Sequence, residues 1–290
     1  MKRLFLIMFP AGVAAALGLW AFDCVNAPAG NLFSDTSGLL LAAGRLAGLL
    51  AALGILAQLL LVSRAKWLEP LFGLDRSTRA HHISGLVIPF ALVLPPVLIT
   101  LYHAGRKGIS FTAQLGVMMG REDLPAAAAG AFLVLAAVVM SLPAARRRFS
   151  YEVWHASHLL LYAGLGLAVG HQLELGADIN GNLYFARTWH ALYVFALANL
   201  LWGRVLKPLW LYRRHGFTVE KIIPETTEVE SIWITGRGLD ALPAEAGQFA
   251  LLRFWAPGFK TQSNPLLLSR MPDGKYLRFS IKKMWDFTAE

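Results

Sequence analysis

Residues 155–173 read HASHLLLYAGLGLAVGHQL, an apolar stretch that opens on His155 and contains two histidines further inside, His158 and His171. A helix needs about 20 predominantly apolar residues to cross a bilayer, so this stretch predicts a transmembrane helix. An imidazole inside a bilayer is costly unless it has a partner. The two histidines are therefore candidate ligands of a bound group.

Further stretches of similar length and composition predict the remaining spans, at about 4–22, 38–62, 83–103, 124–143 and 188–206. The first resembles a signal peptide, but Phe22-Asp23-Cys24 lacks the small residues of a cleavage site, so we interpret it as a helix. The chain has 56% hydrophobic and 16% charged residues, against roughly 25% charged in soluble domains. The sequence therefore predicts an integral, multi-pass membrane protein with an all-α domain of six transmembrane helices.

The net charge of +9 is distributed beside the apolar stretches rather than along one soluble face, which argues against nucleic-acid binding. More basic residues follow the second, fourth and sixth stretches than the others. They are Arg64, Lys66, Arg76, Arg79, Arg146, Arg147, Arg148, Lys207, Arg213 and Arg214, against Arg106, Lys107, Arg121 and Arg187 on the opposite side. By the positive-inside rule, both termini are expected in the cytoplasm.

After Arg214 the sequence changes to runs in which apolar and polar residues alternate and β-branched residues are frequent. These predict strands over Phe217–Glu225, Val229–Gly236, Gln248–Trp255 and Tyr276–Met284, with a turn at Pro272-Asp273-Gly274 among others. We expect a membrane domain over 1–214 and a small cytoplasmic antiparallel β-domain over 215–290. A nicotinamide-binding domain is not expected, because no βαβ pattern and no GxGxxG after a strand are present.

Histidine is the metal ligand that the sequence offers in quantity, since one cysteine cannot build a cysteine-only zinc or iron–sulfur site. Two helices that each supply a histidine at the same depth can ligate haem between them. His81 and its neighbour His82 open the stretch 83–103 and are the candidates opposite His158. His171 lies 13 residues beyond His158, about 20 Å along a helix, which suits a second, stacked haem but leaves the two side chains apart in azimuth.

Arg45 is a cation inside the stretch 38–62. A buried cation needs an anionic partner, and a haem propionate is one candidate. We interpret His103, His190 and His215 as interfacial or solvent-exposed residues.

Three motifs carry a family resemblance: Gly73-Leu74-Asp75-Arg76 leading into His81 and Gly85, Trp154 with His158-Leu159-Leu160-Leu161-Tyr162, and Gly247-Gln248-Phe249. With them the chain resembles the ferric reductase-like transmembrane domain of bacterial ferric reductases and NADPH oxidases, followed by the start of a ferredoxin-reductase-type FAD-binding barrel. The resemblance implies six helices in the bacterial cell membrane and two stacked b-type haems on the third and fifth helices. It also implies electron flow from NADPH through FAD and haem to ferric iron or dioxygen outside.

Carried over residue by residue, the resemblance makes His81, with His82 as rival, and His158 the inner haem ligands. His171 is the outer ligand, but the position of its partner on the third helix is occupied by Pro95-Pro96, and proline cannot ligate iron. We therefore expect one tightly held haem b and a doubtful second one.

The flavin site also departs from the family. The family has a histidine, proline, aromatic and Ser/Thr run where this chain reads Asn264-Pro265-Leu266-Leu267-Leu268-Ser269, and glycine where it has Trp285. The resemblance assigns Gln248, Asn264, Ser269 and Lys282 to FAD. Fewer polar contacts and the bulk of the indole predict that FAD binding is weak or lost.

The leading interpretation is a transmembrane electron-transfer haem protein that takes electrons from a cytoplasmic flavin or nicotinamide donor and passes them to ferric iron or dioxygen outside. Two alternatives stay open. The chain could be a haem subunit that serves a partner reductase, or a catalytically silent relative that acts as a membrane scaffold.

Overall fold

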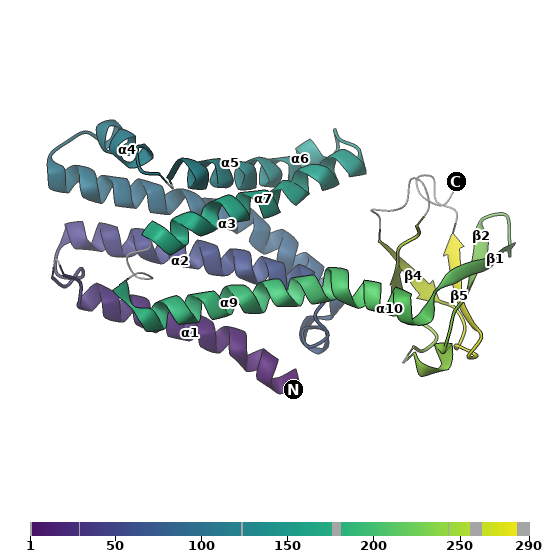
Figure 1. Ribbon diagram of the computed structural model, residues 1–290. Coiled ribbons are helices and arrows are strands. Elements are labelled where there is room, and N and C mark those ends of the chain that lie inside the picture. Colours follow the sequence, from purple (N-terminus) through teal and green to yellow (C-terminus); the bar gives the residue numbers. More distant parts are fainter. Residues whose placement is uncertain are drawn as a thin grey trace. The chain divides into compact units, whose positions relative to one another are not determined.

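A computed structural model describes residues 2–28, 30–122, 124–175, 181–242, 244–255 and 263–282. The chain divides into two compact units, Met1–Arg204 and Val205–Glu290 (Figure 1). The first is helical, and the second contains a short helix and a β-sheet.

Helices form the whole regular structure of the first unit. In chain order they are α1 Lys2–Val25, α2 Thr36–Val62, α3 Glu69–Lys107, α4 Phe111–Met119, α5 Leu124–Ser141, α6 Pro143–Arg146, α7 Tyr151–Leu175 and α9 Leu183–Leu201, followed by the π-helical turn η1, Trp202–Leu206. Within the described residues, six helices (α1, α2, α3, α5, α7 and α9) are long and apolar enough to cross a membrane. The prediction of a multi-pass integral membrane protein is confirmed.

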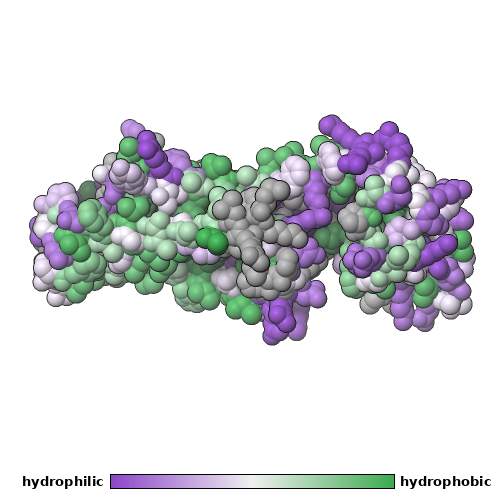
Figure 2. Space-filling view, turned by 90° about the horizontal axis from the view of Figure 1, so that it is seen from below, coloured by the Kyte–Doolittle hydropathy of each residue, from purple (hydrophilic) through white to green (hydrophobic). Residues whose placement is uncertain are grey.

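Large apolar side chains on these helices face outward. Phe90 on α3 is 74% exposed, Phe132 on α5 69% and Val194 on α9 66%. On the face drawn in Figure 2, apolar residues cover much of the helical unit. A soluble protein rarely exposes so large an apolar surface, whereas lipid chains accommodate it at no cost.

Two pairs of helices pack closely along their lengths, α2 against α3 and α5 against α7. Small residues permit this approach. A Cβ atom added at Gly130 on α5 would lie 2.5 Å from the carbonyl oxygen of Gly164 on α7, and one added at Gly44 on α2 would lie 2.8 Å from Cγ1 of Ile99 on α3. Glycine at such contacts lets helix backbones meet inside a membrane, where dispersion rather than hydrophobic burial drives association.

A third group of contacts joins α1, α2 and α9. Leu56, Trp189 and Ala196 are almost completely buried in this cluster. In α3 the non-helical residue is Gly73, with φ 65° and ψ 170°, while Pro95 and Pro96 lie inside a helix that continues to Lys107.

The second unit begins with α10, Lys207–His215, and carries one antiparallel sheet. Its strands are β1 Thr218–Pro224, β2 Val229–Thr235, β3 Phe249–Leu252, β4 Asn264–Leu268 and β5 Tyr276–Lys282, in the order β1-β2-β5-β4-β3. Over the described residues the sheet is open, with β1 and β3 at its edges, so the expected partial barrel does not close. The four predicted strands are present. The fifth, β4, has a proline at its second residue and lacks alternation, which hides it from pattern analysis.

The sheet core and one turn follow from local chemistry. Phe279 and Leu239 are among the most buried side chains of this unit. At the predicted turn, the backbone N–H groups of Tyr276 and Lys275 donate to Asp273 and hold the pKa of its carboxyl below the usual range. An Asp side chain that accepts hydrogen bonds from its own turn in this way fixes the backbone conformation where β5 begins.

Candidate functional site

His81 on α3 and His158 on α7 face each other. The centroids of their rings are 6.0 Å apart and the ring planes are inclined at 79°. An imidazole nitrogen binds a metal at about 2 Å, so two rings that share one metal ion have their centres roughly 6 Å apart. The pair therefore has the separation that axial ligation of one metal from both sides requires.

The two histidines belong to different closely packed helix pairs, α2–α3 and α5–α7. Each pair holds its own histidine through polar contacts with the neighbouring helix. The site thus lies between two independently braced halves of the helical unit.

Ser141, at the end of α5, holds His158. Its Oγ lies 3.3 Å from Nδ1 of His158, accepts a hydrogen bond from Nε1–H of Trp154 at 3.2 Å, and donates to the carbonyl oxygen of Ala137 at 2.8 Å. The indole of Trp154 also stacks on the imidazole of His158, with centroids 5.4 Å apart and planes at 26°. The contact with Ser141 therefore restrains the imidazole at its edge, and the indole of Trp154 restrains it at its face.

These contacts favour one tautomer of His158. A serine hydroxyl has one hydrogen, and here it goes to the backbone of Ala137. The contact with His158 is then a hydrogen bond only if Nδ1 carries the proton and donates. Nε2 is left with its lone pair, which is the form of imidazole that ligates a metal.

The packing of α5 on α7 places Ser141 at this point. The two helices touch at Gly130 and Gly164, and they run antiparallel, because Ser141 further along α5 meets Trp154 and His158 earlier on α7. The glycine contact sets the distance between the axes of α5 and α7. Ser141 lies about three turns further along α5 than Gly130, and at this axis distance its hydroxyl reaches the imidazole of His158.

Gln58 on α2 holds the turn of α3 that carries His81, as Ser141 holds His158. Its Nε2 donates to the carbonyl oxygen of His81 and to Oγ of Ser84, at 3.1 Å each. A Cβ atom at Gly85 would come within 3.2 Å of that amide nitrogen, so glycine at 85 leaves room for the contact. The spacing of His81 and Gly85 thus has a physical reason in helix packing.

Nδ1 of His81 is buried and has no hydrogen-bond partner in the part of the chain that the structure describes. A buried polar atom without a partner costs roughly 1–3 kcal/mol. A bound group that contacts this nitrogen would remove part of that cost.

Haem suits this donor set better than a bare metal ion. Among the described residues no group of three or more His, Cys, Asp or Glu side chains could hold a metal ion. Two axial histidines are sufficient for haem, because the porphyrin supplies the remaining nitrogens. His81 and His158 are thus the residues that would hold it.

The other expected ligands lie apart from this pair. His82, next to His81, is exposed. His171 is half-buried on α7, about 20 Å from the level of His158. Pro95 faces α2, where its ring carbons lie 3.6 and 3.7 Å from a Cβ built on Gly48. The described part of α3 therefore presents no histidine opposite His171 at that position.

Arg45 is half-buried on α2 but does not reach the histidine pair. Gln58 is the residue of α2 that contacts His81. Arg45 precedes Gln58 by 13 residues, which is about 20 Å along the helix. Its neighbour Gly44 packs on Ile99 of α3. Arg45 thus lies at the level of His171.

The structure corrects one of the three histidines that the sequence suggested to be interfacial or solvent-exposed. His190 is exposed, as expected, and His103 is half-buried. His215 is not solvent-exposed: it is 3% exposed, its Nδ1 lies 2.7 Å from the carbonyl oxygen of Arg237, and it stacks on Phe217 at 5.3 Å. The expectation for His215 was wrong because a helix end gives no hint that a sheet loop folds over it.

The residues assigned to FAD offer few unused polar groups. Oε1 of Gln248 accepts from the backbone N–H of Glu245 at 3.2 Å, and Oγ of Ser269 donates to the carbonyl oxygen of Arg278 at 3.1 Å. Lys282 pairs with Glu228 at 3.1 Å. Asn264 Nδ2 is buried and has no hydrogen-bond partner among the described residues. Trp285 lies outside the described residues.

Sequence reasoning missed Gln58 and Ser141, the two polar residues that hold the histidines. A signal for both was available, because a lone amide or hydroxyl in an apolar span is expensive unless it bonds to a neighbouring helix. Its partner, however, cannot be read from the chain.

Comparison with known proteins agrees with this geometry. Residues 47–169 match the family described as ferric reductase like transmembrane component. This segment runs from α2 to α7 and includes Gln58, His81, Ser141 and His158. No curated protein matches the chain significantly. Residues 47–169 are therefore similar to a ferric reductase-like transmembrane domain, as the resemblance predicted.

Proposed function

We propose that the helical unit is a transmembrane electron-transfer protein that holds one haem b between His81 and His158. The observation that carries this proposal is the 6.0 Å separation of the two rings, each braced by a polar residue of an adjacent helix. The match of residues 47–169 to a ferric reductase-like family supports it.

When bound, haem supplies the one-electron chemistry, and the protein supplies ligands, orientation and an apolar surround. Nε2 of His158 is left unprotonated for ligation when Nδ1–H donates its hydrogen bond to Oγ of Ser141. Gln58 ties the His81 turn to α2.

For the electron donor we propose a flavin or nicotinamide reductase that acts from the cytoplasmic side, where the positive-inside rule places both termini. This proposal is supported by the hydrogen bonds that the polar groups of Gln248 and Ser269 already make within the β-unit. The acceptor is proposed to be ferric iron or dioxygen on the opposite face of a bacterial cell membrane.

The test is electron transfer across a sealed bilayer. The purified chain, reconstituted in liposomes with ferricyanide trapped inside and a membrane-impermeant reductant outside, is expected to show a b-type spectrum and to bleach the ferricyanide. His158→Ala serves as the loss-of-function control and His82→Ala as the matched neutral variant. A wild-type preparation without a haem spectrum would refute the proposal and leave the scaffold interpretation.

A further inference from the structure

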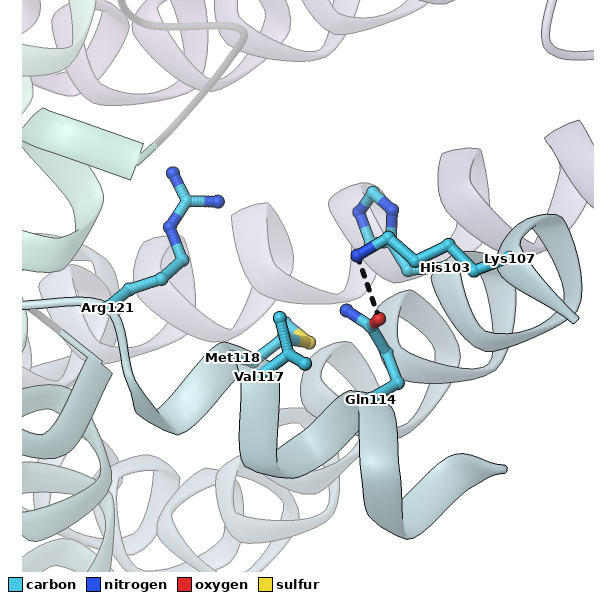
Figure 3. Close-up of a pocket in the computed structure, with 6 residues that line it drawn as sticks. All are labelled: His103, Lys107, Gln114, Val117, Met118 and Arg121. Atoms are coloured by element: carbon cyan, nitrogen blue, oxygen red, sulfur yellow. Dashed lines mark hydrogen bonds between the residues drawn. The ribbon is translucent and has the colours of Figure 1, made fainter. Parts of the chain in front are cut away.

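A cavity of about 110 Å³, lined by both polar and apolar side chains, lies where α3 meets α4, away from the histidine pair. It is lined by His103 and Lys107 of α3, Gln114, Val117 and Met118 of α4, and Arg121 just after α4. Figure 3 shows the side chains of His103, Lys107 and Arg121 around the same space above α4.

The lining carries positive charge without a carboxylate among its described members. Lys107 and Arg121 are cations, and His103 lies one turn before Lys107 on the same helix. Gln114 is only 3% exposed, and its Oε1 accepts a hydrogen bond from Nζ of Lys107 at 3.1 Å. A buried amide thus holds the lysine in place at the cavity wall, and two ammonium hydrogens are left for a ligand.

The cavity lies at the depth of lipid headgroups. The span that contains it runs Asp75–Lys107, 33 residues, or about 50 Å at 1.5 Å per residue. The hydrocarbon core is only about 30 Å thick, so the ends of such a span extend into the headgroup layers. Lys107 is the last residue of this span.

The outer surface of α4 is apolar beside the cavity. Leu115, Val117 and Met119 are 37%, 55% and 40% exposed. Helix α4 itself is held to α3 by Oγ1 of Thr100, which donates to Sδ of Met118 at 3.3 Å. Cations next to exposed apolar side chains at headgroup depth match a phosphoryl group whose apolar tails continue into the membrane.

We propose that this cavity binds an anionic phosphoryl group through Lys107 and Arg121, with His103 as a further donor. The space accommodates a tetrahedral anion together with water. Arginine supplies the paired donors that match phosphate oxygens, and lysine adds a point charge. The group can belong to a lipid headgroup or to a soluble phosphate. The site is separate from the proposed haem site and does not depend on it.

The experiment measures binding to the purified full chain in a phosphate-free detergent solution by calorimetry. The probes are dihexanoyl phosphatidylglycerol, dihexanoyl phosphatidylcholine and inorganic phosphate. The variant is Arg121→Gln, and its matched control is Arg187→Gln, which removes one exposed arginine at the start of α9. Lys107→Gln is a second variant, and elution volume and helical circular dichroism verify that each protein is folded.

Arg121→Gln and Lys107→Gln are each expected to weaken binding about tenfold, the loss of one charged hydrogen bond, while Arg187→Gln retains wild-type affinity. If phosphatidylglycerol binds more tightly than inorganic phosphate, the source is a lipid headgroup, and the reverse order identifies a soluble phosphate. Equal losses in Arg121→Gln and Arg187→Gln, or no binding of any probe to the folded wild type, would overturn the proposal.

Discussion

The hydroxyl of Ser141 lies 3.3 Å from Nδ1 of His158, although the two residues are on different helices. Because that hydroxyl already donates to Ala137, the imidazole is left to donate from Nδ1 and to present Nε2. This arrangement leaves Nε2 free to ligate the haem iron that we propose at this site.

His158→Ala and His81→Ala are each expected to abolish the low-spin b-type spectrum, since either change leaves the iron with one axial ligand. His82→Ala should retain it, because His82 is exposed and does not face His158. Absorption spectra of oxidised and reduced protein give the answer. An unchanged spectrum in His158→Ala would show that the ligand assignment is wrong.

Haem stoichiometry is expected to be about one per chain. His171→Ala should keep that value, because Pro95 faces Gly48 on α2 and provides no ligand opposite His171. The pyridine haemochrome assay, normalised to protein, measures the ratio. Two six-coordinate haems in the wild type, with one lost in His171→Ala, would contradict this prediction.

Ser141→Ala removes the hydrogen-bond partner that orients His158. Loss of such a partner lowers metal-site affinity by roughly 10- to 100-fold, so faster haem loss to an acceptor protein and a shifted reduction potential are expected. Ser157→Ala is the matched control, since the Ser157 hydroxyl donates to the backbone of Trp154 instead. Equal rates of haem loss in the two variants would rule out the orienting role of Ser141.

Gly130→Ala is expected to destabilise the helical unit by about 1–3 kcal/mol, because its Cβ would lie 2.5 Å from a backbone oxygen of α7. Gly166→Ala, on α7 with nothing within 4 Å of the new Cβ, is the control and should be neutral or slightly stabilising. Thermal unfolding in detergent measures both. A Gly130→Ala variant as stable as Gly166→Ala would mean that the glycine contact does not set the helix spacing.

FAD is expected to bind the chain weakly, with a dissociation constant above the micromolar range. The hydroxyl of Ser269 donates to Arg278, and Leu267 offers none, so at least one polar contact to the flavin is missing, at roughly 1–3 kcal/mol each. Flavin fluorescence during titration of the purified chain measures the affinity. Submicromolar binding would show that the β-unit is a working flavin site.

Much of the fold followed from the chain alone. The six spans are separated by charged or turn-forming segments, and each approaches the length that a bilayer demands, so hydropathy was sufficient to find them. Four strands were predicted by their alternation. The strand Asn264–Leu268 was not, because Pro265 and a run of leucines break the pattern.

The candidate site was only half predictable. The cost of a histidine in a bilayer directs attention to His81, His82, His158 and His171 without any structure. It does not say which of them meet, since that depends on the rotation of each helix about its axis.

By itself, therefore, the sequence determined that this is a multi-pass membrane protein with histidines in three of its spans, because hydrophobic length and the penalty for a buried imidazole are properties of local composition. Only the tertiary structure decided that His81 rather than His82 faces His158, and that Ser141 and Gln58 support them. Those choices come from close contacts such as Gly130 with Gly164, where backbone shape and not composition sets how two helices meet.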